Sequence, residues 1–255
     1  MTQTKKQGIS ITIAGVVVLL AGLICFWQFR AASNLAFALS LIGVIVGAVI
    51  TFSGLAVLRA KQERKIDTKK LVLAAMMAAL CYIGFSYFKI DITVAGGSTA
   101  CHLGNVFCVL GALLLGGVWG GLAGAVGMTI GDLMFPAYVV SAPKTFLLKL
   151  GIGLIVGLVA HKGFKLSRAS DPKKVTIATV VSSVAGMAFN IVADPVVGYF
   201  YKTYLLGVPQ DAANIWVKIG AVTTAVNAVI AVIVASIAYL ALRPAMKKAK
   251  LFPEV

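Results

Sequence analysis

The sequence predicts an all-α membrane protein that crosses the bilayer several times. Of its 255 residues, 60% are hydrophobic and 12% are charged, whereas soluble domains are about 45–50% apolar and about 25% charged. Apolar runs of near-spanning length also recur along the whole chain. Because a spanning helix takes about 20 residues, eight such runs leave only short connections. The composition therefore excludes a large soluble catalytic domain.

The expected spans fall at 8–29, 36–58, 71–88, 103–115, 121–134, 146–160, 175–199 and 216–242. A basic segment, RAKQERKIDTKK at 59–70, interrupts the apolar runs after the second span. We therefore divide the chain into an N-terminal transmembrane hairpin of unknown role at 1–60 and a cytoplasmic linker at 61–70. A six-helix membrane core follows at 71–245, and a cytoplasmic tail at 246–255.

The distribution of charge predicts the orientation in the membrane. The chain carries 23 Lys and Arg against 8 Asp and Glu, a formal net charge of +15. If the N-terminus is cytoplasmic and the spans alternate in direction, 17 of the 23 basic residues face the cytoplasm. Such an excess is expected on the cytoplasmic side because basic loops resist translocation across the membrane. These residues form four short segments that suit anionic lipid better than nucleic acid. We expect both termini on the cytoplasmic side of a prokaryotic cell membrane.

The motifs of common enzyme classes are missing. No Gly-Lys dipeptide occurs, so the chain has no Walker A loop for ATP phosphates, and no G-x-S-x-G elbow is present. An intramembrane aspartyl protease would need a pair such as Asp132 and Asp194, but Thr129 breaks the G-x-G-D pattern before Asp132. We expect no enzymatic activity and keep this protease as a minor alternative.

Ionisable residues within the spans are the main functional signal, because each costs about 2.5–3.5 kcal/mol to insert. Asp132 and Lys149 could form a structural ion pair, and Asp194 could be merely interfacial. Polar groups from several spans nevertheless fall toward the outer side, where a ligand cavity would gather them. The candidate substrate-binding residues are His102, Asn105, Asp132, Tyr138, Lys149, Asn190, Asp194 and Asn227.

A metal site is not expected. Cys101, His102 and Cys108 lie close in sequence, but they include no Cys-x-x-Cys pair and have no carboxylate nearby. Buried thiols that behave as small apolar side chains explain these cysteines better.

Small residues recur four positions apart, which places them on one helix face and allows helices to approach closely. The glycine pairs are 116 and 120, 117 and 121, 120 and 124, 127 and 131, and 153 and 157. Ala74 with Ala78 and Ala75 with Ala79 repeat this spacing in the third span. We attribute most glycines to internal packing and expect the alanines to form a docking face.

An ordered series of motifs then points to a family. The series comprises AAMMAA at 74–79, TACHLGN at 99–105, LGGVWGGLAGAVG at 115–127, GDL at 131–133, PKTF at 143–146 and VNA at 226–228, with Lys149, Gly151, Gly153 and Gly157. In this order and spacing, residues 68–245 resemble the substrate-binding S component of an energy-coupling factor (ECF) vitamin transporter. The riboflavin-type branch is the most similar.

This resemblance implies a six-helix fold that binds a vitamin or precursor of the riboflavin, pyridoxine-like or thiamine-precursor class. It implies a membrane T protein and two ABC-type ATPases as partners, with ATP used by those ATPases and no cofactor bound by this chain. It implies T-protein contacts at Ala74, Ala75, Ala78 and Ala79, and a ligand-covering loop at 89–101 with flexible Gly96 and Gly97. The N-terminal hairpin receives no role from it. A transporter or channel that works alone is the alternative.

Overall fold

The computed structural model describes residues 3–29, 47, 68–94 and 97–249. The chain divides into two compact units, Met1–Asp67 and Thr68–Val255, with their boundary inside the basic segment 61–70. In the first unit, α1 (Gln3–Phe29) covers the first expected span. The second expected span, 36–58, lies outside the described residues except for residue 47.

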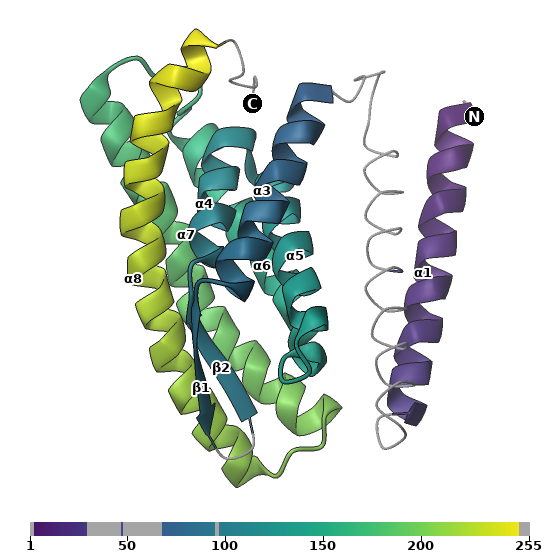
Figure 1. Ribbon diagram of the computed structural model, residues 1–255. Helices are drawn as coiled ribbons and strands as arrows, with labels where there is room; N and C mark the ends of the chain where they lie inside the picture. Colours follow the sequence, from purple (N-terminus) through teal and green to yellow (C-terminus); the bar gives the residue numbers. More distant parts are fainter. Residues whose placement is uncertain (1–2, 30–46, 48–67, 95–96, 250–255) are drawn as a thin grey trace. The chain divides into compact units, whose positions relative to one another are not determined.

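The described part of the second unit contains six α-helices and a two-stranded sheet (Figure 1). The helices are α3 (Thr68–Ser86), α4 (Gly104–Leu115), α5 (Gly117–Met134), α6 (Ala142–Gly157), α7 (Pro172–Phe200) and α8 (Gln210–Lys248). A short 3-10 turn, Val139–Ser141, precedes α6, and π-helical turns, Leu158–Gly163 and Tyr201–Leu205, follow α6 and α7. Each helix covers most of one expected span, so the apolar runs predicted their number in this unit.

Four helical segments are long and apolar enough to cross a membrane: Thr68–Ser86, Val139–Gly163, Pro172–Leu205 and Gln210–Lys248. These segments confirm a helical protein with several membrane crossings, although the expected count of eight is not established. α4 is only 12 residues long, about 18 Å at 1.5 Å per residue. It is therefore too short to cross a hydrocarbon core of about 30 Å by itself.

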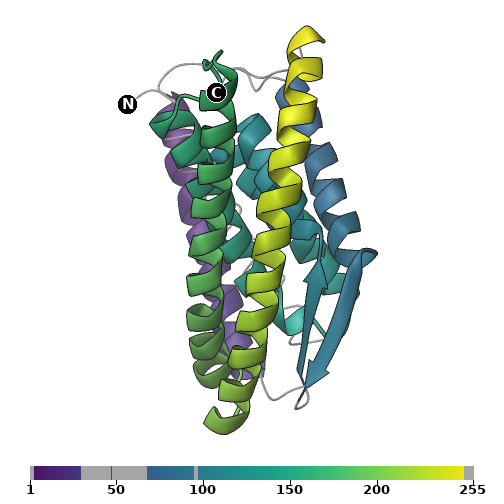
Figure 2. The ribbon, with the colours of Figure 1, turned by 90° about the vertical axis from the view of Figure 1, so that its left-hand side faces the viewer.

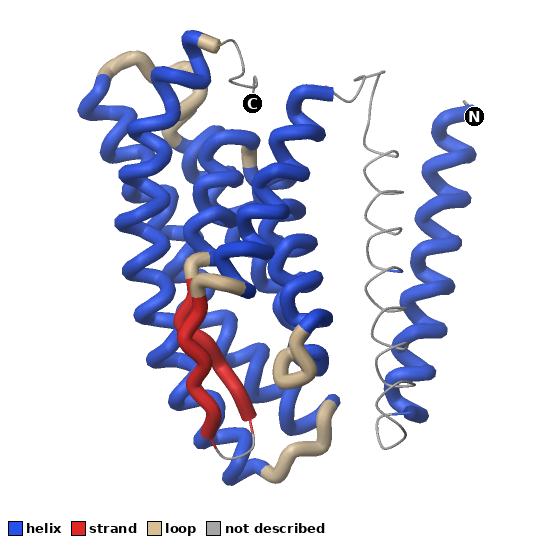
Figure 3. Tube along the Cα trace, viewed as in Figure 1, coloured by secondary structure: helices blue, strands red, loops and turns tan. Residues whose placement is uncertain are grey.

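A β-hairpin replaces the expected loop at 89–101. Strand β1 (Lys89–Val94) pairs antiparallel with β2 (Gly97–His102), from Lys89 opposite His102 to Val94 opposite Gly97 (Figure 3). The all-α prediction missed this hairpin, although its sequence carries a strand signal. Ile90 and Ile92 alternate with polar residues in β1, and such alternation of β-branched and polar residues favours a strand.

The two ends of the six-helix unit differ in composition. The start of α3, the α6–α7 connection and the end of α8 lie at one end, whereas the hairpin and the α5–α6 and α7–α8 connections lie at the other (Figures 1 and 2). The first end carries Lys69, Lys70, Lys162, Lys165, Arg168, Lys173, Lys174, Arg243, Lys247 and Lys248. The basic residues of this end belong to the segments that are expected from the sequence to lie on the cytoplasmic side.

The short helix α4 forms the centre of the unit. Eleven of its twelve residues are buried, and α3, α5, α6 and α8 all pack against it. Its apolar side chains include the fully buried Leu113, Leu114 and Leu115. The chain reverses into α5 at Gly116, whose φ of 89° lies in the left-handed region that glycine adopts without a Cβ clash. This tight turn lets two short helices share the interior.

α5 and α6 cross at close range through glycine, as the four-residue spacing predicts. A Cβ atom at Gly153 would overlap backbone atoms of Gly121, and one at Gly157 would overlap Gly117. Any larger residue at these positions must therefore push the two helices apart.

We expect Gly153→Ala to destabilise the protein by about 1–3 kcal/mol, the usual cost of overpacking a well-packed interior. Gly163→Ala is the matched control, because a Cβ there would meet no atom closer than 3.9 Å. Thermal unfolding of both variants in detergent measures the difference. Equal midpoints for the two variants would contradict the close α5–α6 contact.

Candidate functional site

All eight predicted substrate-binding side chains line one cavity toward the hairpin end of the unit. The cavity has an empty volume of about 580 Å³, which includes space open to solvent. The predicted residues that it gathers are His102, Asn105, Asp132, Tyr138, Lys149, Asn190, Asp194 and Asn227. Phe85, Met128, Ser141, Lys144, Thr145 and Thr224 also contribute to its wall. Their hydrogen bonds divide the eight predicted residues into two groups.

Asn227 uses its amide to hold strand β2. Its Oδ1 accepts a hydrogen bond from the backbone N–H of His102 at 2.9 Å, and its Nδ2 donates to the Ala100 carbonyl at 2.9 Å. The Asn227 side chain on α8 thereby bonds to the backbone of β2 as a neighbouring strand would. Asn227 positions the hairpin over the cavity.

The His102 ring has one nitrogen committed and one available. Its Nδ1 accepts a hydrogen bond from the Gly104 N–H at 3.1 Å, which places the proton of the neutral ring on Nε2. Burial lowers the pKa of His102 to about 3, and the positive charge of Lys149 acts in the same direction. The ring packs edge-on against Phe85, with ring centroids 5.0 Å apart. His102 is therefore a neutral donor at physiological pH.

Tyr138 fastens the other strand of the hairpin. Its hydroxyl donates to Asp91 Oδ1 at 2.5 Å and lies 3.2 Å from the Thr99 carbonyl. Burial, together with the hydrogen bond to Asp91, raises the pKa of this hydroxyl well above its ordinary value. Lys89 completes the cluster, since its ammonium lies 3.2 Å from Asp91 Oδ2 and 4.7 Å from the centroid of the Tyr138 ring. Tyr138 is thus engaged with the protein itself.

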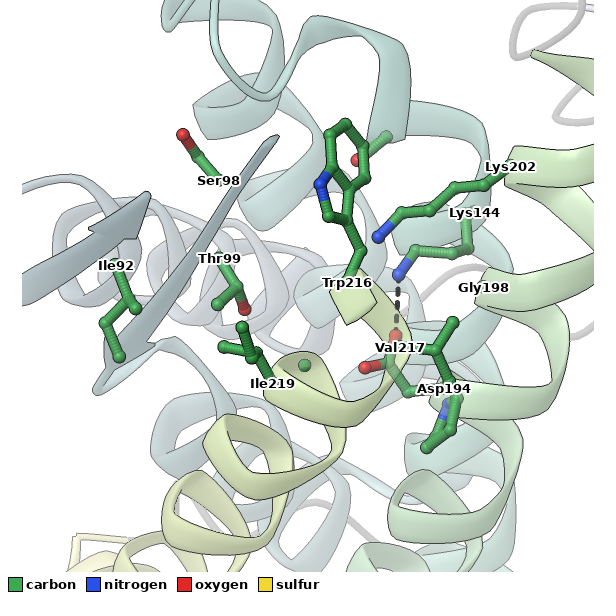
Figure 4. A pocket seen from close by; sticks show the side chains of 13 residues that line it. Ile92, Ser98, Thr99, Lys144, Asp194, Gly198, Lys202, Trp216, Val217 and Ile219 are labelled. Atoms are coloured by element: carbon green, nitrogen blue, oxygen red, sulfur yellow. Dashed lines mark hydrogen bonds and ion pairs between the residues drawn. The ribbon is translucent and has the colours of Figure 1, made fainter. Parts of the chain in front are cut away.

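Asp194 is also fully engaged. Lys144 donates to its Oδ1 at 2.7 Å (Figure 4), and the Thr224 hydroxyl donates to its Oδ2 at 2.7 Å. The ion pair of the helical spans is therefore Lys144 with Asp194. Within the described ranges, Asp132 and Lys149 are not paired within 4 Å. The Asp132–Lys149 pair considered from the sequence is not formed. Both oxygens of Asp194 accept hydrogen bonds from other side chains.

Three oxygens in the cavity have no hydrogen-bond partner among the residues that the structure describes. They are Asn105 Oδ1, Asp132 Oδ2 and Asn190 Oδ1, in residues that are 1%, 2% and 1% exposed. Lys149 adds an ammonium with no carboxylate within 4 Å in the described part of the chain. Since more than nine in ten buried polar groups are hydrogen-bonded, this cluster from α4, α5, α6 and α7 is the candidate site for a ligand.

A family model for the S component of ECF-type riboflavin transporters matches residues 65–244. The chain belongs to this family. No curated protein and no solved structure matches it. The match confirms the resemblance seen over 68–245. The family is a membrane transport component for vitamin uptake, so this S component belongs among transporter subunits.

Sequence reasoning missed several polar residues of the cavity in this S component, among them the two that bond to Asp194, Lys144 and Thr224. A signal for Lys144 was available, because a buried Asp194 needs a cation and Lys144 begins the neighbouring span. Thr224 carried no such signal, since threonine is common in membrane helices and can bond to its own backbone.

Proposed function

We propose that this S component captures a vitamin or vitamin precursor from outside the cell and delivers it through an ATP-driven importer. The observation that carries the proposal is the cluster of unpartnered groups, Asn105, Asp132, Asn190 and Lys149, in one cavity. Leaving such groups buried costs free energy in the empty protein. A ligand that pairs with them recovers that free energy as affinity.

The chemistry of these groups favours a polar ring with several donors. Three oxygens require N–H or O–H donors, while Lys149 and the Nε2–H of His102 offer protons to an acceptor. Phe85 adds an aromatic surface to the same wall. Riboflavin, pyridoxine-like compounds and thiamine precursors all combine ring nitrogens or oxygens with hydroxyl or amino groups, and we propose a substrate from these classes.

The hairpin is proposed to cover the bound substrate. Ala100 and His102 of β2 line the cavity, and Asn227 and Tyr138 fasten the two strands at either side. The residues expected at the tip are Gly96, which lies outside the described residues, and Gly97, which pairs with Val94. Release of the Tyr138–Asp91 hydrogen bond would free β1 while Asn227 retains β2.

Partner proteins must supply the energy for import, because the sequence contains no Walker A loop. We propose a membrane T protein and two ABC-type ATPases in this role, with ATP bound by the ATPases and no cofactor bound by this chain. The basic end of the six-helix unit would face the cytoplasm.

The alanine pairs of α3 divide by burial, which narrows the expected docking face. Ala74 is 7% exposed and packs inside the unit, and Ala78 meets α5 at Gly127, where an added Cβ would overlap the Ala78 carbonyl. Ala75 and Ala79 are exposed. The expected contacts at Ala74 and Ala78 are therefore revised to Ala75 and Ala79 for the T protein.

We expect the double variant Ala75→Trp, Ala79→Trp to reduce co-purification of the T protein at least about tenfold, because overpacking an interface costs about 1–3 kcal/mol. Substrate affinity of the isolated variant should stay unchanged. Ala241→Trp on α8 is the matched control, because Ala241 is equally exposed on another helix. Full assembly of the α3 variant would contradict this docking face.

Calorimetric titration of the purified chain with riboflavin, pyridoxine and thiamine precursors tests the proposal as a whole. Saturable binding of one of them at 1:1 stoichiometry is expected. Failure of every compound to bind, together with uptake by proteoliposomes that lack ATPase partners, would instead identify a transporter that works alone.

A further inference from the structure

A second cavity lies beside the first and is not explained by vitamin capture. Its empty volume is about 530 Å³. It shares Ser98, Thr99, Ser141, Lys144 and Asp194 with the inner cavity. Its remaining wall comes from β1, α7, the π-helical turn after α7 and α8, and includes Ile92, Gly198, Lys202 and Trp216 (Figure 4). The Lys144–Asp194 pair therefore stands in the wall between the two spaces.

The outer cavity has an excess of positive charge. Its lining includes two ammonium groups, Lys144 and Lys202, and a single carboxylate, Asp194. Lys144 and Thr224 already occupy both oxygens of Asp194. Within the described chain, no carboxylate lies within 4 Å of Lys202. One cationic charge therefore faces the cavity without an anion to balance it.

Trp216 holds Lys202 toward the cavity. The Lys202 ammonium lies 4.5 Å from the centroid of the indole ring, a distance at which the ring face attracts a cation. Lys202 is half-buried, whereas Lys218, one half-turn beyond Trp216 on α8, is exposed. A lysine near a membrane surface usually extends its charge toward water. The contact with Trp216 instead keeps the Lys202 ammonium inside the site before any anion binds.

The same space offers one further donor for oxygen atoms. The Ser141 side chain belongs to its wall, whereas the Ser98 hydroxyl shares a hydrogen bond with the Thr93 hydroxyl at 3.2 Å. Figure 4 shows the Lys144 and Lys202 ammonium groups directed into one region beside the Trp216 ring. Ammonium and hydroxyl groups around an aromatic face suit a tetrahedral oxyanion better than a neutral ring, because hydrogen bonds to charged acceptors are the strong ones.

We infer that the outer cavity is a second binding site, which takes a phosphate-class oxyanion between Lys144 and Lys202. The anion balances the charge of Lys202 and lies next to the entrance of the vitamin cavity. Its phosphate can come from a free or small-molecule phosphate in solution or from the headgroup of an anionic lipid. The site does not depend on which vitamin the inner cavity binds.

Thermal unfolding of the full chain in phosphatidylcholine nanodiscs tests this site with inorganic phosphate, at constant ionic strength against chloride. We expect phosphate to raise the unfolding midpoint saturably. Lys202→Met should raise the half-saturating phosphate concentration at least about tenfold, because a charge-assisted hydrogen bond is lost. Lys218→Met removes the same charge from the exposed neighbour and should leave that concentration unchanged. Lys202→Gln serves where the methionine variant does not fold.

A second set of nanodiscs that contains about one-third phosphatidylglycerol separates the two sources of phosphate. An unchanged phosphate response there assigns the site to soluble phosphate. Loss of the response, with phosphatidylglycerol retained by the wild type and not by Lys202→Met in native mass spectrometry, assigns the same site to a lipid headgroup. Equal responses of Lys202→Met and Lys218→Met, or no effect of either anion on the wild type, would overturn the inference. Because no vitamin is present, this result is independent of vitamin binding.

Discussion

Asp132→Ala is expected to lower vitamin affinity at least about 30-fold without destabilising the ligand-free protein. Asp132 is 2% exposed, and its Oδ2 has no hydrogen-bond partner among the described residues. A buried hydrogen-bonding group whose free oxygen pairs with the ligand contributes about 2 kcal/mol or more to binding, which corresponds to this loss of affinity. In the empty protein its removal relieves a desolvation cost. Calorimetric titration and thermal unfolding of the variant measure the two quantities.

The matched control for this prediction is Asp211→Ala, which makes the same change at an exposed position in the first turn of α8. We expect this control to alter neither affinity nor stability. A ligand-free Asp132→Ala protein that unfolds several degrees earlier than the wild type would show that Asp132 is structural. Unchanged affinity would show that it does not contact the substrate.

Asp194→Ala is expected to act in the opposite way and to destabilise the protein whether or not a vitamin is bound. Asp194 accepts hydrogen bonds from Lys144 and Thr224 at 2.7 Å each, and its removal leaves Lys144 without its anion. Breaking a buried ion pair costs about 3–5 kcal/mol. The side chains of Lys144 and Asp194 are 15% and 21% exposed, so we expect a loss near the lower value. Chemical unfolding in detergent measures it.

The double variant Lys144→Met, Asp194→Ala separates the loss of the pair from the penalty of an unpaired charge. When neither charge remains, no ammonium is left uncompensated. We therefore expect the double variant to be more stable than the sum of the two single variants predicts. Strict additivity would contradict the ion pair as the cause of the destabilisation.

Length and apolarity were sufficient to predict the six helices of the second unit. An apolar segment within lipid must hydrogen-bond its own backbone N–H and C=O groups, and a helix does so within a single segment. The hairpin escaped prediction for a local reason. Its strands are short and lie between strong helical runs, and the family resemblance implies only a loop at 89–101, so the alternation of Ile90 and Ile92 with polar residues does not stand out as a strand signal. The break after residue 115 was expected from the spans, but the neighbouring glycines did not indicate that the turn falls at Gly116 and that α5 begins at Gly117.

The members of the candidate site were easier to predict than their pairing. Scarcity of polar residues in apolar spans was enough to indicate the side chains that share the inner cavity. Which lysine pairs with Asp194 depends on the rotation of α6, since Lys144 and Lys149 are five residues and more than one helical turn apart. The same limit applies to α3, where the adjacent Ala74 and Ala75 differ by about 100° around the helix axis and only Ala75 is exposed.

Analysis of bound small molecules tests the central claim most directly. The wild type and Asp132→Ala are purified in parallel from cells grown with vitamins, and the extracts are examined by mass spectrometry. We predict that the wild type carries close to one equivalent of a vitamin or vitamin precursor and that Asp132→Ala carries almost none. No small molecule on the wild type after saturation with the candidate vitamins, or equal amounts on both proteins, would contradict vitamin binding at the unpartnered groups of the inner cavity.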